Sequence, residues 1–342
     1  MLGWRRIWRP AQYHGIGKRR NFFEGWYYKL VDASEQHAYA VIPGVFLGAT
    51  ESVSYCFVQT LDGSSGQTTF HRYPLADFQA SRTKFDIAIG PNRFWADHLA
   101  LAIDAPDRQM RGELALVGLK PWPVTLFSPG IMGWYAFVPL MECYHGVLSF
   151  DHRIDGRLQI DGRDLSFSGG RGYTEKDWGR SFPSAWIWLQ SNHFGTEGTS
   201  LTASVATIPW LGSAFRGFIA GFWHRGQLYR FATYTGASIE TLTVTDREVV
   251  WRVSGQAGTG HCRGAYRLEI VADRAEGGLL HAPLRQAMLP RVAESLTAKI
   301  AVRLWRREAR CEQLVFDAEG HHAGMEINGE LQKLTTGGVS HE

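Results

Sequence analysis

The sequence predicts an all-β protein made of antiparallel strands. Many segments alternate apolar and polar residues with a period of two, the pattern of a strand with one buried face. Asp-Gly or Asn-Gly pairs, at 62–63, 155–156, 161–162 and 328–329, mark tight turns. The chain also has 38 glycines, abundant aromatic residues and few sustained helical periods. We therefore expect many short strands joined mainly by hairpins.

The expected strands run along most of the chain. The clearest is 296–305, where Leu296 and Ala298 face one way and Thr297 the other. The alternating segments are 39–46, 83–89, 99–103, 111–117, 146–150, 157–160, 201–208, 216–223, 242–244, 249–253, 266–271 and 296–305. A helix is plausible only over 284–294, where Pro283 could open it and Pro290 would interrupt it.

The length of 342 residues suits two domains of about 150 residues each. The best boundary is the Gly- and Asp-rich stretch 161–172. We therefore expect a basic N-terminal arm over 1–20, a first domain over 21–165 and a second over 166–342. The segments FEGWYY, at 23–28, and EKDWG, at 175–179, could be equivalent opening strands of the two halves.

Charge and composition exclude several classes of function. The net charge of +3 is small, and the basic clusters are too scattered for a nucleic-acid groove. No apolar run approaches the roughly 18 residues of a transmembrane helix, and arginines interrupt the N-terminus where a signal peptide would be apolar. The four cysteines form no CxxC pair. We expect a cytoplasmic protein that can also make peripheral contact with a membrane surface.

The stretch GYTEKDWGRSFPSAWIWLQSNHF, at 172–194, concentrates chemistry-bearing residues. In an extended chain Glu175 and Asp177 project to one side and Lys176 to the other. Two close carboxylates in a tryptophan-lined pocket would raise at least one pKa and give a proton donor near neutrality. The alternative is a structural salt bridge of Glu175 with Arg171 or Arg180.

The second half of this stretch alternates as a strand. Trp186, Trp188, Gln190 and Asn192 share one side, while Ile187, Leu189, Ser191 and His193 share the other. One side resembles a core and the other the lining of a cavity. We therefore take Trp178, Trp186, Trp188, Gln190 and Asn192 as candidate substrate-binding residues.

Two other segments carry candidate residues. Glu24, Trp26 and Tyr28 share one face of the FEGWYYK strand, where the carboxylate could orient a phenol or carry a proton. The alternative is that this strand only plugs the base of a barrel. Glu142 and His145 follow an apolar run, and a histidine there could relay a proton at neutral pH. A lone strand histidine is, alternatively, a core or rim residue.

Several motifs in order carry a family resemblance. They are YHG at 13–15, RRNFFEGWYYKL at 19–30, GWYAFVPLMECYHGVLSF at 133–150, EKDWG with FPSAWIWLQ, and AGMEINGEL at 323–331. In this order and spacing they resemble the tocopherol cyclase family, and more distantly the lipocalin-like proteins that include carotenoid hydratases. The resemblance implies two lipocalin-like antiparallel barrels or half-barrels packed together.

The resemblance also implies an activity, the cofactor-free cyclisation of a prenylated hydroquinone to a chromanol. Glu175 is the expected proton donor, with Asp177 and Glu24 supporting or replacing it. Trp26, Trp178, Trp186 and Trp188 could offer π-faces to the developing positive charge. A hydratase-like enzyme that admits water, and a non-catalytic carrier of an apolar molecule, are the alternatives.

Two further expectations concern partners. The N-terminal arm places Trp4, Ile7 and Trp8 among arginines, which suits reversible binding to an anionic lipid surface. The alternative is a disordered or packed-down arm. The sequence has no P-loop, no dinucleotide fingerprint, no HExxH and no nucleophile elbow. We therefore expect no cofactor, no metal and no nucleic-acid partner. The family resemblance implies a hydrophobic prenyl lipid as the ligand.

Overall fold

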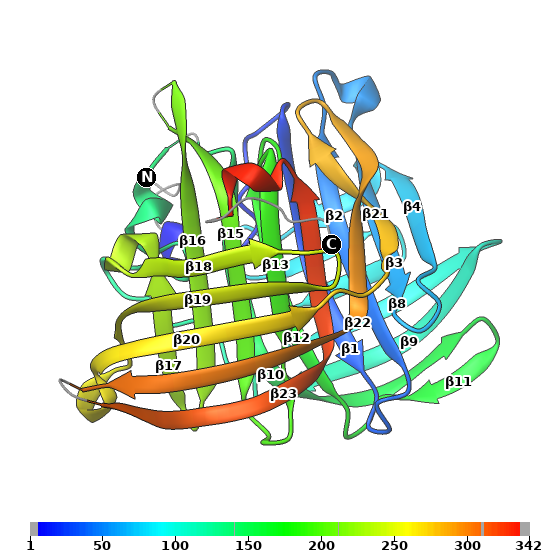
Figure 1. Ribbon diagram of the computed structural model, residues 1–342. Helices are drawn as coiled ribbons and strands as arrows, with labels where there is room; N and C mark the ends of the chain where they lie inside the picture. Colours follow the sequence, from blue (N-terminus) through cyan, green and yellow to red (C-terminus); the bar gives the residue numbers. More distant parts are fainter. Residues whose placement is uncertain (1–5, 140, 211, 309–310, 336–342) are drawn as a thin grey trace. The chain divides into compact units, whose positions relative to one another are not determined.

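The computed structural model describes residues 6–139, 141–210, 212–308 and 311–335 (Figure 1). It confirms the all-β prediction, because the described residues form two large antiparallel sheets. Turns and short 3-10 helices connect the strands within them. The described residues contain no helix long and apolar enough to cross a membrane. All four cysteines are free.

The first sheet has twelve strands, in the order β4-β3-β2-β1-β12-β10-β9-β8-β7-β6-β5, with β11 paired to β10. Their bounds are β1 Phe22–Val31, β2 Ala38–Leu47, β3 Tyr55–Asp62, β4 Thr68–Pro74, β5 Phe78–Ala80, β6 Asp86–Ile89, β7 Asn92–Trp95, β8 His98–Ala105, β9 Arg108–Val117, β10 Cys143–Ile160, β11 Arg163–Ser166 and β12 Arg171–Gly179. The 3-10 turns around them are η1 Arg6–Trp8, η2 Glu51–Val53, η3 Leu75–Asp77 and η4 Gly133–Phe137.

The second sheet has eleven strands, in the order β17-β16-β15-β13-β23-β22-β20-β19-β18, with β14 paired to β23 and β21 to β22. Their bounds are β13 Ala185–Ser191, β14 His193–Phe194, β15 Ser200–Trp210, β16 Ser213–His224, β17 Gln227–Ala232, β18 Ser238–Val244, β19 Glu248–Ala257, β20 Gly264–Asp273, β21 Gly278–Leu284, β22 Ala287–Arg307 and β23 Glu312–Gly329. Its 3-10 turns are η5 Thr233–Thr235, η6 Gly260–Cys262 and η7 Leu331–Lys333. In the described part of the chain neither path of paired strands returns to its first strand, so the sheets are open rather than closed barrels.

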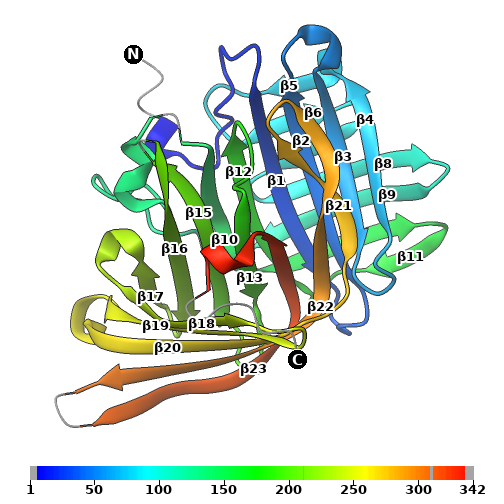
Figure 2. The ribbon, with the colours of Figure 1, turned by 45° about the horizontal axis from the view of Figure 1, so that its top comes forward.

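The division of the chain differs from the expected boundary at 161–172. One compact unit comprises Met1–Phe182 with Gly278–Arg291, and the other comprises Pro183–Gly277 with Val292–Glu342. The EKDWG strand β12 pairs with β1 on one side and β10 on the other, so its hydrogen bonds hold it in the first sheet (Figure 2). FEGWYY and EKDWG are therefore neighbours in one sheet and do not open equivalent halves.

The helix considered over 284–294 does not form, because this segment is a turn followed by a strand. Strand β21 ends at Leu284, and β22 begins at Ala287 and continues through the segment. Arg285 has a φ of 53°, which turns the chain back between the two strands. The Gln59 side chain accepts from the His281 backbone N–H at 2.7 Å and donates to its carbonyl at 3.3 Å, and this contact ties the inserted segment to β3.

Each unit has its own apolar core. In the first, Trp26, Tyr28 and Phe94 pack among the aliphatic residues of β8, β9 and β10. In the second, Ile187 and Leu189 of β13 pack with the inward residues of β15 and β22. The alternation seen in the sequence correctly assigns these residues to the buried faces.

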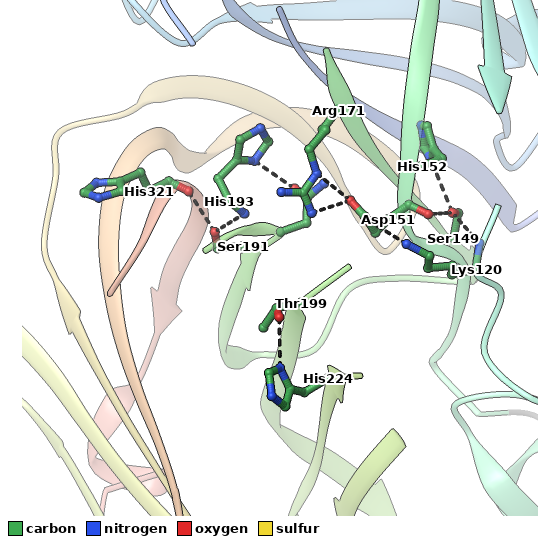
Figure 3. A network of polar contacts seen from close by, with 11 residues as sticks. Lys120, Ser149, Asp151, His152, Arg171, Ser191, His193, Thr199, His224 and His321 are labelled. Carbon is green, nitrogen blue, oxygen red and sulfur yellow. Dashed lines mark hydrogen bonds and ion pairs between the residues drawn. The ribbon is translucent and has the colours of Figure 1, made fainter. Parts of the chain in front are cut away.

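A buried polar network lies where β10 meets β12. Asp151 is buried and accepts from Arg171 Nη2 at 2.7 Å and from Lys120 Nζ at 2.9 Å (Figure 3). The neighbouring His152 is also buried, and its Nδ1 lies 3.1 Å from Ser149 Oγ. Burial lowers the pKa of His152 to about 4.

We expect His152 to make folding sensitive to acid. The unfolded imidazole gains its proton near pH 6.5, whereas the folded one stays neutral to about pH 4, so the unfolded state binds more protons in this window. The free energy of unfolding should therefore fall by about 3 kcal/mol through this group as pH drops from 7 to 4. Urea titrations at both pH values measure it. His152→Asn, which keeps a hydrogen-bonding side chain near Ser149, should lose less, and an equal loss in both proteins would contradict the assignment.

Candidate active site

Strand β12 carries the EKDWG motif between two partner strands. Its Glu175 lies opposite Tyr27 of β1 and Val147 of β10, and its Asp177 lies opposite Gly25 and His145. Directly opposed residues of antiparallel strands project to the same face. The register therefore confirms that Glu175 and Asp177 share a face, and it adds His145 to that face.

The side chains on this face form a continuous polar chain. His145 Nδ1 lies 2.9 Å from Asp177 Oδ1, and His145 Nε2 lies 3.4 Å from Glu175 Oε2. The Tyr173 hydroxyl, two residues before Glu175, donates a short hydrogen bond to the same Oε2. Glu175 is buried, while Asp177 and His145 are partly exposed. The alternative salt bridge of Glu175 with Arg171 is not formed, because Arg171 binds Asp151 instead.

This arrangement can hold and move a proton. A carboxylate only accepts hydrogen bonds, so Asp177 fixes a proton on His145 Nδ1 and leaves Nε2 to exchange one with Glu175. A Cβ added at Gly25, opposite Asp177, would meet no atom closer than 3.8 Å, so this position leaves room beside the carboxylate. Ligand atoms of His145, Glu175 and Asp177 also lie within 4.8 Å of one another, so the cluster could hold a metal ion.

The opposite face of β12 carries a separate charged cluster. Lys176 Nζ forms a short ion pair with Glu24, and it lies 2.7 Å from the Gln12 carbonyl and 3.1 Å from His14 Nδ1. Glu24 and Lys176 are both fully buried. Burial disfavours the charged carboxylate, but Lys176 and His14 outweigh it, so the pKa of Glu24 is lowered. Glu24 therefore stays ionised near neutral pH. It also lies on the opposite face of the sheet from Glu175.

Two predicted substrate contacts belong to this second cluster. Lys176 Nζ lies 4.9 Å from the ring centroid of Trp26 and 4.8 Å from that of Trp178. His14 also stacks on Trp178 with centroids 4.2 Å apart. The lysine already occupies the faces of both rings, on the side of β12 away from Glu175. The expected tryptophan lining of the Glu175 site by Trp26 and Trp178 is therefore corrected.

The structure places Tyr28 and Glu142 away from the polar chain as well. Tyr28 is fully buried in the first core, and its hydroxyl donates to the Trp95 carbonyl at 2.9 Å. Glu142 lies just before β10 and is half-buried. Burial raises the pKa of Glu142, and Arg285 and Arg291 oppose that rise. Among the described residues, no hydrogen bond or ion pair joins Tyr28 or Glu142 to Glu175 or Asp177.

The second unit carries the other candidates on one face of β13. Trp186 lies opposite Ala206, Trp188 opposite Ser204 and Gln190 opposite Thr202, so the three share a face. Trp186 Nε1 donates to Glu326 Oε2 at 2.6 Å, and the side-chain Oδ1 of Asn192 lies 3.1 Å from His193 Nδ1. Gln190 is fully buried, yet both polar atoms of its amide lack a hydrogen-bond partner.

Sequence reasoning missed two residues of the first unit. Tyr173 hydrogen-bonds Glu175, and the available signal was its position two residues earlier, which places it on the same face of the strand. His14 belongs to the YHG motif, but nothing local shows that it reaches Lys176, 162 residues away. The alternation predicted the side of the strand to which Lys176 projects but not its partner.

These observations define an all-β protein with a strand-borne acid and base cluster. A family model described as tocopherol cyclase-like matches residues 104–329. The chain belongs to this family, as the motifs predicted.

Relatives of known name agree with this assignment. The chain is 28% identical to the chloroplastic tocopherol cyclase of Zea mays over 205 residues, which are 58% of this chain and 41% of the relative. It is 26% identical to the probable chloroplastic tocopherol cyclase of Oryza sativa subsp. japonica over 214 residues, 60% of this chain and 44% of the relative. The chain thus spans less than half the length of these relatives.

Solved structures share the fold at low identity. CghA with Sch210972 matches with a TM-score of 0.53 and 12% identity, covering 90% of this chain and 89% of that one. Kievitone hydratase from Nectria haematococca matches with a TM-score of 0.50 and 12% identity, covering 93% and 91%. At such identities the likeness concerns the fold alone.

Proposed function

We propose that this protein cyclises a prenylated hydroquinone to a chromanol by acid initiation and without a cofactor. The observation that carries the proposal is the chain Asp177, His145, Glu175 and Tyr173 on one face of the EKDWG strand. Family membership and the named cyclases of maize and rice support the reaction class. The Glu175 carboxyl group and the His145 imidazole together supply a transferable proton at the position where we expect the acid.

Glu175, His145 and Asp177 each have one role in this mechanism. Glu175 gives its proton to the alkene carbon nearer the ring, which leaves positive charge on the tertiary carbon. The phenol oxygen then bonds to that carbon and closes the chromanol ring. The phenol proton returns to the cluster, so the reaction is an isomerisation. His145 re-protonates Glu175, and Asp177 orients His145 through Nδ1.

Product identification tests this function. The protein is incubated with a prenylated hydroquinone dispersed in detergent, and the products are separated by chromatography and mass. Chromanol is the predicted product, whereas a tertiary alcohol would indicate a hydratase and unchanged quinol a carrier. Added chelator should leave the chromanol yield unchanged, and loss of product with chelator would assign an ion to His145, Glu175 and Asp177.

We further propose that the face of β13 bearing Trp186, Trp188, Gln190 and Asn192 binds ligand in the second unit. The Gln190 amide offers a donor nitrogen and an acceptor oxygen, which match a hydroxyl group that both accepts and donates. Ser200 Oγ, on the same side of neighbouring β15 as Thr202, is also buried without a partner. A hydroxylated aromatic ring has the donor, the acceptor and the apolar surface that would complement these groups and the tryptophans.

Gln190→Met should change stability and binding in opposite directions. Removing an unsatisfied buried amide should raise the free energy of unfolding by about 1 to 3 kcal/mol. The affinity for the hydroquinone should fall by at least about 5- to 10-fold, the value of a single lost hydrogen bond. Urea unfolding and equilibrium titration measure the two effects.

The control for this variant is Thr207→Val. Its hydroxyl is also buried without a partner, but Thr207 lies on the other face of β15 from Thr202. The control should gain stability and keep its affinity. If Gln190→Met also keeps its affinity, a buried water rather than the ligand satisfies the amide.

A further inference from the structure

An exposed apolar turn lies between β9 and β10. Val124 and Pro129 form an isolated antiparallel bridge, and the backbone N–H groups of Thr125 and Ser128 donate to each other's carbonyls at 3.0 and 3.3 Å. The two central residues are Leu126 and Phe127, 65% and 79% exposed. Turn positions of this kind normally hold glycine, asparagine, aspartate or serine. We call residues 124–129 the apolar turn.

The N-terminal arm braces this turn. Trp8 Nε1 donates to the Leu126 carbonyl at 3.0 Å, and the Trp8 ring packs edge-on against Phe137, with centroids 5.4 Å apart. In Figure 2 the dark-blue turn η1 lies beside the teal turn η4 that contains Phe137. Trp8 is therefore occupied by intramolecular packing, and Trp4, the other tryptophan of the arm, lies outside the described residues.

The surroundings of the apolar turn are basic in sequence. No aspartate or glutamate occurs between Glu113 and Glu142, or before Glu24. Arg6 and Arg9 flank Trp8, which contacts the turn, and Arg9 is exposed. An exposed pair of large apolar side chains beside arginines, without nearby acids in either segment, complements an anionic bilayer interface.

We infer that the apolar turn inserts Leu126 and Phe127 into the surface of an anionic membrane, with Arg6 and Arg9 held near the lipid headgroups. This inference moves the insertion from the arm tryptophans to the turn that the arm supports. The predicted vesicle binding needs no substrate, so its test gives a result that does not depend on the proposed cyclisation.

The test is sedimentation with vesicles of phosphatidylcholine containing 30% phosphatidylserine. The double variant Leu126→Ser with Phe127→Asn uses residues that tight turns favour, so the fold should be kept. Its vesicle affinity should be lower than that of the wild-type protein by at least about tenfold. Leu314→Ser is the matched control, since Leu314 is 51% exposed on β23, and it should bind like the wild-type protein.

Charge and self-association provide two further readouts. Arg9→Gln should weaken binding to the anionic vesicles but not to pure phosphatidylcholine, and 1 M salt should do the same, because the Debye length falls from about 10 Å at 0.1 M to about 3 Å. Equal vesicle binding by the wild-type protein and the turn variant would overturn the inference. A wild-type dimer that becomes a monomer in the turn variant would overturn it too, because a second copy would then cover the turn.

Discussion

Glu175→Gln is expected to lower the rate of cyclisation by about 10² to 10⁴ while the protein stays folded. Glutamine keeps the length of the side chain and still accepts from the Tyr173 hydroxyl, but it has no proton to transfer. The measurement is the initial rate of chromanol formation, accompanied by the affinity for the hydroquinone, which should change little. A loss confined to the rate is the signature of a missing acid.

One further variant on this face and one control elsewhere in the unit separate the roles. Asp177→Asn should lower the rate less than Glu175→Gln, because Asp177 acts by orienting His145. Glu113→Gln, which removes an exposed carboxylate from β9 of the same unit, should leave the rate unchanged. If Glu175→Gln keeps near-full turnover and Asp177→Asn abolishes it, the acid is Asp177. If neither variant affects turnover, the carboxylate pair has only a structural role.

Lys176→Met is expected to lower the free energy of unfolding by about 3 to 5 kcal/mol. The change leaves the Glu24 carboxylate fully buried without the charge that offsets its burial. It also removes the donor to the Gln12 carbonyl that ties the N-terminal segment to β12. Urea unfolding at pH 7 measures the loss.

The double variant Glu24→Gln with Lys176→Met identifies the cause. It removes both charges together, so a large part of the lost stability should return. If the free energy of unfolding of Lys176→Met alone lies within about 1 kcal/mol of that of the wild-type protein, the ion-pair interpretation is contradicted. A double variant as unstable as Lys176→Met would show that the other contacts of the ammonium group, to the Gln12 carbonyl and to the rings of Trp26 and Trp178, matter instead of its pairing with Glu24.

Local alternation correctly predicted which side chains share a face. It separated Glu175 and Asp177 from Lys176, and Ile187 and Leu189 from Trp186 and Trp188, because the side-chain period of a strand is two whatever its neighbours are. The family motifs pointed to the candidate acid Glu175, which lies on strand β12. These inferences needed no information from distant parts of the chain.

Strand pairing was beyond the reach of local patterns. Glu24 and Lys176 are 152 residues apart, and His145 and Asp177 are 32 apart, so their contacts depend on which strands become neighbours. The same reason explains why the two compact units differ from the expected division, since nothing within EKDWG shows that it hydrogen-bonds with β1. At 284–294 Pro283 suggested the start of a helix, but the turn at Arg285 makes a hairpin whose second strand accommodates Pro290.

The most direct test of the central claim, proton transfer from the Glu175 cluster to the alkene, is cyclisation in ²H₂O. Carboxyl and imidazole protons exchange with solvent, so the acid then carries deuterium. We predict a chromanol with one deuterium on the methylene carbon that was the alkene CH, formed by the wild-type protein and suppressed by about 10² or more in Glu175→Gln. A chromanol without deuterium, or equal deuterated product from both proteins, would contradict the account.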